Sequence, residues 1–155
     1  MLGEKYVIRK LLTSENDGHY PGYLINGARI TDYFDDVVHE LINMAAGNGR
    51  IRSYKDIQFT FPVWQGDTME YQGWIERVEG NIYEIHLEAL KIKTFTDDFK
   101  VHYQFGHVSI QSAKLRGYEG PEVLDPPIIC GSAVAFVEVV PDEYFGPADP
   151  KYSVE

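Results

Sequence analysis

The spacing of apolar side chains changes once along the chain, and that change separates one helix from a set of strands. From Asn26 onward, apolar residues recur at the i, i+4, i+7 and i+8 spacing of an amphipathic helix. They are Ile30, Phe34, Val37, Val38, Leu41 and Ala45. Asn26 has a side chain that commonly caps a helix N-terminus, and the sequence "GNG" at 47–49 is typical of a helix stop. The pattern therefore predicts one long helix between these two signals.

On both sides of this helix, branched and aromatic residues predict strands. The stretch "KYVIRKLL" at 5–12 predicts a first strand, and the residues after the helix predict four more. These four are 50–63, 68–78, 82–95 and 127–140, with the turns "WQGD" and "EGN" between the first three of them. Between Ile82 and Ala89, apolar residues alternate with Glu84, His86 and Glu88, as in a half-buried antiparallel strand. Tight turns between consecutive strands favour a meander over parallel crossovers.

The order of one strand, one helix and four strands predicts a single α+β domain at residues 1–140. It is the order of the hotdog fold, in which an antiparallel five-stranded sheet wraps around one long central helix. The pattern also allows other α+β rolls and a cystatin-like fold, so it defines the class and not the specific fold. Residues 95–127 interrupt the strands with a long polar stretch, interpreted as an insertion or lid. Residues 141–155 are Pro-rich and acidic and are expected to form a surface tail.

Composition narrows the class of partner. The chain has 155 residues and a formal net charge of −10, which argues against nucleic acid or an anionic membrane as the main partner. Both of those partners require a concentrated basic face. The single cysteine, Cys130, cannot form an intramolecular disulfide, and its apolar neighbours predict a small buried side chain. The sequence contains no signal-peptide pattern and no apolar run of membrane-spanning length, so we expect a cytoplasmic protein.

The predicted helix carries charged residues on one side, and these are the first candidates for chemistry. At about 100° per residue, Arg29, Tyr33, Asp36 and Glu40 fall on one stripe. A carboxylate whose pKa is raised by partial burial can act as a base, and it also attracts a cationic substrate. The same stripe is what any surface helix presents to water, with Arg29 pairing with neighbouring acids. From helix geometry alone, both interpretations stay open.

Outside the helix, histidines and basic pairs give weaker signals. His19 lies with Tyr20 in the polar loop before the helix, where a histidine is more often solvated than catalytic. His39 and His86 are interpreted as structural, and no histidine has metal-ligand spacing to cysteine or acidic residues. Two basic pairs are candidates for binding phosphates, although such charges also protect the edges of sheets. These pairs are Arg52 with Lys55 and Lys91 with Lys93.

Several separated segments resemble, in order and at similar spacing, the β-alanyl-CoA and 3-aminobutyryl-CoA ammonia-lyases. The segments are "HYPGYLINGAR", "FDDVVHEL", "YKDIQFTFPVWQGDTMEYQGWIERV" and "PPIICGSA". The resemblance covers most of residues 5–94 and returns at 125–140. It implies a hotdog enzyme, a CoA-dependent carbon–nitrogen lyase that reversibly eliminates ammonia from a short β-aminoacyl-CoA to give the enoyl-CoA. A hotdog acyl-CoA thioesterase, an enoyl-CoA hydratase and a non-catalytic acyl-CoA-binding protein are the alternatives.

The resemblance also implies roles for residues around the helix. Asp36 and Glu40 match acidic positions of the lyases, which implies that one of them moves the proton and the other holds the ammonium group. Asp32 and Asp35 have no such match and are expected to be ordinary surface charge. Substrate-binding residues are expected in the loop and the first helical turn. They are His19, Tyr20, Gly22, Asn26, Gly27 and Arg29.

The implied elimination needs no metal. Backbone N–H groups of the turn from Gly22 to Gly27, with the helix dipole behind them, can stabilise the thioester oxygen as it gains enolate character. We therefore expect no metal and no cofactor except coenzyme A, which enters as part of the small-molecule substrate. Pro21, Tyr23 and Asp35 differ from the usual residues of the lyases near the expected acyl pocket. The resemblance therefore defines the reaction better than it defines the acyl chain.

The predicted sheet is too open to stand alone. A single helix gives too little cover for a chain with 14% aromatic residues, and the sheet has a free edge. Pairing two sheets removes this edge. We therefore expect a homodimer or a higher oligomer built from dimers, with the pocket between protomers.

Overall fold

One helix and five strands make up the described part of the chain, in the order that the sequence predicts. The computed structural model describes residues 2–13, 24–94 and 122–140. The elements are β1 (Tyr6–Leu11), α1 (Gly27–Ala45), β2 (Gly49–Phe59), β3 (Thr68–Glu79), β4 (Ile82–Thr94) and β5 (Glu122–Val139). Within those ranges, no helix has the length and apolar character needed to cross a membrane.

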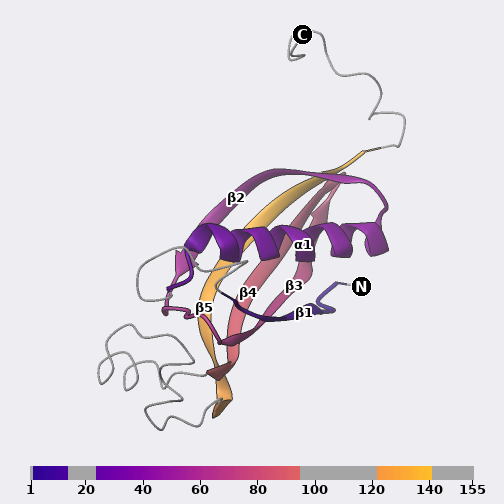
Figure 1. Cartoon of the computed structure of the whole chain (residues 1–155). Coiled ribbons are helices and arrows are strands. Elements are labelled where there is room, and N and C mark those ends of the chain that lie inside the picture. Colours follow the sequence, from indigo (N-terminus) through magenta and orange to yellow (C-terminus); the bar gives the residue numbers. More distant parts are fainter. Residues whose placement is uncertain (1, 14–23, 95–121, 141–155) are drawn as a thin grey trace, which may run out of the picture.

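The five strands form one antiparallel sheet in the order β1-β3-β4-β5-β2. Figure 1 shows this sheet curving behind α1, which lies across one of its faces. A long helix held in the curve of an antiparallel sheet is the hotdog arrangement. The predicted α+β class and the predicted fold are therefore confirmed.

The prediction of a simple meander is wrong for β2. Strands β3, β4 and β5 are neighbours in sequence order, but β2 pairs with β5 at the opposite edge of the sheet from β1. The turn at 64–67 continues the pairing of β1 instead, because the N–H of Leu12 donates to the carbonyl oxygen of Asp67 at 3.0 Å. Residues 60–67 are too long a connection for a tight hairpin. The turn signals in the sequence therefore did not reveal that β2 pairs with β5.

Local signals do define the two ends of α1. Asn26 has extended backbone angles, φ −77° and ψ 154°, and its Oδ1 accepts a hydrogen bond from the N–H of Arg29 at 2.9 Å. At the other end, the N–H groups of Ala46 and Gly47 donate to the carbonyl oxygen of Ile42 at 2.8 and 3.0 Å. Gly47 has a φ of 90°, which a glycine adopts without strain. Both predicted helix signals are confirmed.

The core lies between the buried side of α1 and the inner face of the sheet. The buried helix residues are Ile30, Tyr33, Phe34, Val37, Val38, Leu41 and Ile42. They meet alternate residues of the strands, including Ile85 and Leu87 of β4, as the alternation predicts. Cys130 of β5 is also buried, which confirms its interpretation as a small core residue. At Gly73 of β3 the helix lies so near that an added Cβ would be 2.8 Å from Val37 Cγ1.

Strand β5 begins earlier than the pattern predicts. It starts at Glu122, so residues 122–127 of the segment interpreted as an insertion belong to the sheet. Pro126 and Pro127 lie within this strand, where the pairing of β4 with β5 shifts between Lys91 and Lys93. Proline cannot donate to a strand ladder, so an irregular register accommodates it. Residues 95–121 and the tail at 141–155 lie outside the described residues.

Candidate active site

The N-terminus of α1 is held from two sides. Asn26 caps the helix, and just before it the N–H of Ile25 donates to the carbonyl oxygen of Val63 at 2.8 Å. Leu24 pairs with Trp64 in an isolated antiparallel bridge. The first N–H groups of a helix have no intrahelical acceptor, so this end presents donors and the positive end of the helix dipole. Residues 63 and 64 thus help to position a group of donors suited to an oxyanion.

A pocket of about 320 Å³ lies against this N-terminus. Its walls come from the start of α1 with the two residues 24 and 25 before it, and from the end of β2 with the segment that follows. The lining residues are Leu24, Ile25, Gly27, Ile30, Phe59, Thr60, Phe61, Pro62 and Val63. The ring of Phe59 lies so close to Gly27 that a Cβ there would be 2.7 Å from Phe59 Cζ. An apolar wall beside helix N–H groups suits the acyl end of a thioester.

Asp36 and Glu40 lie on the solvent side of α1, and both are exposed. At about 1.5 Å per residue, Asp36 is about 14 Å along the axis from Gly27, and Glu40 is about 20 Å from it. The α-carbon of a thioester is bonded to its carbonyl carbon. One protomer therefore does not bring the N–H donors and these carboxylates to the same substrate. The catalytic role of Asp36 and Glu40 stays a prediction.

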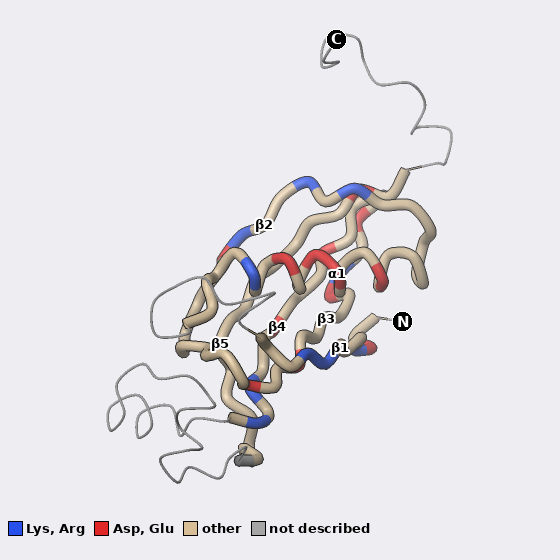
Figure 2. The backbone as a smooth tube through the Cα atoms, viewed as in Figure 1, with Lys and Arg blue, Asp and Glu red and all other residues tan. Residues whose placement is uncertain are grey.

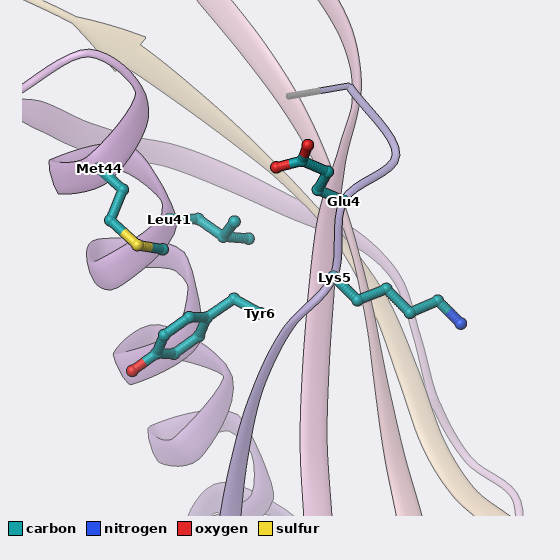
Figure 3. A pocket seen from close by; sticks show the side chains of 5 residues that line it. All are labelled: Glu4, Lys5, Tyr6, Leu41 and Met44. Carbon is teal, nitrogen blue, oxygen red and sulfur yellow. The ribbon is translucent and has the colours of Figure 1, made fainter.

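A second pocket, of about 250 Å³, lies between the C-terminal half of α1 and the start of β1. Figure 3 shows Leu41, Met44 and Tyr6 directed into the space between helix and strand, whereas the Lys5 side chain points away from the helix. Glu4 completes the lining. This pocket is far along the helix from the N–H donors, so we do not assign the thioester to it.

Arg29 and Tyr33, which helix geometry places on the polar stripe, have different surroundings. Arg29 Nη1 is 3.2 Å from Asp32 Oδ2, an ion pair that fits the surface interpretation of this stripe. Tyr33 is only 8% exposed, and its ring centre is 4.8 Å from that of Tyr71 on β3. Assigning Tyr33 to the exposed stripe is therefore wrong. Tyr33 lies at the edge of the apolar stripe, and its ring packs against an aromatic side chain of the sheet.

Asp35, expected to be ordinary surface charge, is half-buried and accepts a hydrogen bond from the Tyr54 hydroxyl of β2. Burial raises the pKa of Tyr54 well above its ordinary value, and the hydrogen bond to Asp35 and that residue's negative charge act in the same direction. Tyr54 therefore stays protonated and ties α1 to an edge strand. The expectation for Asp35 is wrong because its partner lies on β2, which helix periodicity cannot reveal.

The two described histidines fit a structural interpretation. His39 Nδ1 is 2.8 Å from the carbonyl oxygen of Asp35, one turn earlier on the helix. His86 lies on the outer face of the sheet, where its Nε2 is 3.2 Å from Glu84 Oε2. No cluster of three or more His, Cys, Asp or Glu that could hold a metal ion occurs in residues 2–13, 24–94 and 122–140.

The predicted substrate-binding residues divide into two sets. Asn26, Gly27 and Arg29 lie together in the cap and first turn of α1, beside the 320 Å³ pocket that Gly27 lines. His19, Tyr20 and Gly22 lie outside the described residues, and their roles stay predictions.

The basic pairs proposed for phosphates differ in their surroundings. Arg52 Nη1 is 2.8 Å from Glu138 Oε2, and Lys55 Nζ is 5.5 Å from the centre of the Phe136 ring. Lys91 is wholly buried, so it cannot meet a phosphate in solvent, and that alternative is wrong. Its partner inside the protein is Asp67, which local sequence does not reveal. Figure 2 shows basic positions along β1 and along β2, on either side of α1, which carries several acidic positions.

The fold places the chain among hotdog proteins, a class that includes acyl-CoA enzymes. An acyl-CoA hydrolase from Staphylococcus aureus, solved with butyryl coenzyme A and coenzyme A, has a TM-score of 0.61 and 11% identity, covering 90% of this chain and 65% of the hydrolase. A thioesterase superfamily member from Thermus thermophilus has a TM-score of 0.63 and 10% identity, covering 93% and 86%. At such identities the likeness shows the fold alone. No family model matches the chain.

Two ammonia lyases are similar to this chain in sequence, and one of them is also similar in structure. β-Alanyl-CoA:ammonia lyase from Clostridium propionicum is 33% identical, with a TM-score of 0.75, covering 96% of this chain and 94% of the lyase. A 3-aminobutyryl-CoA ammonia lyase from Acetoanaerobium sticklandii is 35% identical over 86 residues, which are 55% of this chain and 68% of that lyase. The chain belongs to this family of ammonia lyases that act on aminoacyl-CoA thioesters, as the resemblance implies.

The interaction of Tyr54 with Asp35 predicts a specific pH dependence. Replacing Tyr54 by Phe should lower the free energy of unfolding by about 1–2 kcal/mol near neutral pH, through loss of one hydrogen bond to a charged group. The folded-state pKa of Tyr54 is raised, so its contribution is complete below the unfolded-state pKa, about 10, and falls as pH rises. The difference between wild type and Tyr54→Phe should therefore shrink by about 1.4 kcal/mol per pH unit above about pH 10. Urea unfolding at neutral and alkaline pH measures it, and a constant difference would contradict the raised pKa.

Proposed function

We propose that this chain catalyses the reversible elimination of ammonia from a short β-aminoacyl-CoA, either 3-aminobutyryl-CoA or β-alanyl-CoA, to give the enoyl-CoA. The observation that carries this proposal is the 33% identity with β-alanyl-CoA:ammonia lyase across 96% of this chain and 94% of that one. The pocket beside the N-terminus of α1 supports it, since a thioester oxygen there meets helix N–H groups. Coenzyme A enters with the substrate, and we propose no metal and no other cofactor.

The proposed reaction divides between two kinds of group. A base removes the α-proton while the bond from the β-carbon to nitrogen breaks, and the electron pair of that bond leaves with the amine. Negative charge that develops on the thioester oxygen is stabilised by the N–H donors at Gly27 and Ala28. A carboxylate supplies the base, and a second carboxylate attracts the β-ammonium group of the substrate. Asp36 and Glu40 are proposed for these two roles, on the family match.

Spacing along α1 argues that the complete site takes its parts from two protomers. The donors and the carboxylates lie about 14–20 Å apart on one helix, so a carboxylate that reaches the substrate has to come from another copy. Strand β2 offers a place for that copy, because its outer edge pairs with no strand in the described part of the chain. Ile57, Phe59 and Phe61, at and just beyond the end of β2, are 43%, 53% and 36% exposed. A free edge that ends in exposed apolar side chains is a surface that association covers.

A product assay tests the function directly. Purified protein mixed with crotonyl-CoA or acryloyl-CoA and ammonium should yield the β-aminoacyl-CoA, detected by liquid chromatography with mass spectrometry. A hydroxyacyl-CoA as the main product would make the chain a hydratase, and free coenzyme A would make it a thioesterase. Binding without any product would contradict catalysis and leave an acyl-CoA-binding protein.

The helix carboxylates should carry the proton transfer and the ammonium binding. Asp36→Asn and Glu40→Gln keep the size of each side chain but remove its charge. Loss of the proton-transferring group should lower kcat by about 10²- to 10⁴-fold, and loss of the ammonium-binding group should act mainly on KM. His19→Ala should be milder, because His19 is assigned to the shape of the pocket.

Asp32→Asn is the matched control for these carboxylates. It removes a carboxylate from the same exposed side of α1, one that pairs with Arg29 at 3.2 Å. This variant should keep kcat and KM within about threefold, since exposed ion pairs contribute little. If Asp36→Asn and Glu40→Gln fold and keep near-normal turnover, these carboxylates have no catalytic role and the acidic stripe only faces solvent.

Complementation between inactive variants tests the shared site. Gly27→Leu should block the pocket beneath Phe59, and Asp36→Asn should remove a carboxylate that the partner contributes. When the two variants are co-expressed in equal amounts, half of the dimers combine them, and each of these contains one intact site. Activity should therefore return to about a quarter of the wild-type value per chain. The mass of the mixed protein, compared with the 17.7 kDa of one chain, shows whether the variants associate. If they associate and the mixture is as inactive as each variant alone, the site is not shared in this way.

A further inference from the structure

An ion pair lies fully inside the protein, between the connection that precedes β3 and the central strand β4. Asp67 and Lys91 are both 0% exposed, and Lys91 Nζ is 3.1 Å from Asp67 Oδ2. Burying two charges costs free energy because both lose their hydration. A buried ion pair is therefore often no more stabilising than apolar residues of similar volume. The contacts of each charge show what the pair holds in place.

Both charges reach into the same short stretch of backbone. Lys91 Nζ donates to the carbonyl oxygen of Pro62 at 2.9 Å and lies 5.0 Å from the centre of the Phe61 ring. Asp67 Oδ2 accepts a hydrogen bond from the N–H of Trp64 at 2.9 Å. The pair therefore contacts residues 61, 62 and 64, which belong to the connection between β2 and β3.

This stretch forms one wall of the pocket at the N-terminus of α1. Phe61, Pro62 and Val63 line that pocket. The carbonyl oxygen of Val63 accepts from the N–H of Ile25 at 2.8 Å, and Trp64 pairs with Leu24. The segment that leads into α1 is thus bonded to the stretch that the ion pair holds. A displacement of residues 61–64 would move both the apolar wall and the helix N–H groups.

We propose that Lys91 is a positioning residue for this site and acts on it through the carbonyl of Pro62 and the ring of Phe61, while Asp67 serves as its buried counter-ion. The inference rests on the proposed lyase function. Donors that stabilise a developing oxyanion must be held within about 0.5 Å of the productive position. Misplacement by about 1 Å can cost about 10²-fold in rate. The buried charges supply that constraint from a position that never touches the substrate.

Three variants separate positioning from simple stability. Asp67→Asn keeps an oxygen and the size of the side chain at position 67, and Lys91 can still donate to the carbonyl oxygen of Pro62. Lys91→Met leaves the carboxylate of Asp67 buried without its counter-ion, so the melting temperature should fall by about 10 °C. Asp67→Asn with Lys91→Met removes both charges of this pair and should recover most of that loss.

The double variant should recover melting temperature without recovering kcat. Asp67→Asn should keep kcat for ammonia addition to crotonyl-CoA within about threefold of wild type. The double variant should lose about tenfold or more in kcat with little change in KM for the CoA thioester, because the donors are misplaced while the rest of the substrate still binds. Thr94→Val is the matched control. It removes the hydroxyl that donates to Asp67 Oδ1 at 2.7 Å, at the same depth, without touching Pro62, and it should keep wild-type kcat.

A second readout does not depend on activity. Hydrogen exchange of the Ile25 amide, measured by NMR, should accelerate about tenfold or more in the double variant, because its acceptor Val63 is released. Amides in the middle of β4 should keep wild-type protection, and so should the Ile25 amide in Thr94→Val. Wild type that makes no β-aminoacyl-CoA would overturn the proposed function alone, since the exchange measurement would still test the positioning role.

Two outcomes would overturn the positioning role. One is a folded double variant with wild-type kcat and wild-type exchange of the Ile25 amide. The other is Asp67→Asn losing as much kcat as the double variant at an equal melting temperature, which would make the pair purely structural. If the double variant does not fold, Asp67→Asn with Lys91→Leu carries the same comparison.

Discussion

Burial of one apolar stripe of α1 against the inner face of the sheet is the constraint on which the rest of the structure depends. The stripe includes Phe34, Val37 and Val38, which are wholly buried. Gly73 of β3 lets the helix lie close, since an added Cβ would be 2.8 Å from Val37 Cγ1 and 2.9 Å from Leu87 Cδ2. With these side chains in place, the helix has no freedom to rotate or slide. Its capped N-terminus must lie against residues 59–63, and its carboxylates must face away from the core.

The packing of α1 on the sheet determines which functional groups a single chain brings together. It brings an apolar pocket and the helix N–H groups together at one end of α1, where Gly27 and Phe59 meet. The same packing keeps Asp36 and Glu40 on the solvent side, far along the axis. Donors and acids that lie about 14–20 Å apart on one helix are the geometric basis for the proposal that two protomers share the site. Among the described strands, the outer edge of β2 has no partner, so it is the place proposed for a second copy.

Two polar contacts fix segments at the edge of the core to the helix and the sheet. Tyr54 donates to Asp35 and ties α1 to the edge strand β2. The buried pair of Asp67 and Lys91 holds the connection that lines the pocket. Each joins residues far apart in sequence, and each constrains a backbone segment that apolar packing alone leaves less well defined. A polar contact of this kind is directional, so it selects one arrangement where many apolar arrangements would fill the same volume.

Local physics accounts for what the sequence determined about this protein. The helix and its ends follow from periodicity and from the side chain of Asn26, and the strands follow from alternation, because both signals act between residues a few positions apart. Family membership was also readable, since matching segments occur in order. Only the tertiary structure decided that β2 pairs with β5 and that Tyr33 turns inward. It also decided that Asp35 and Lys91 have buried partners, Tyr54 and Asp67, because contact across the fold depends on how the sheet closes around the helix and leaves no local pattern.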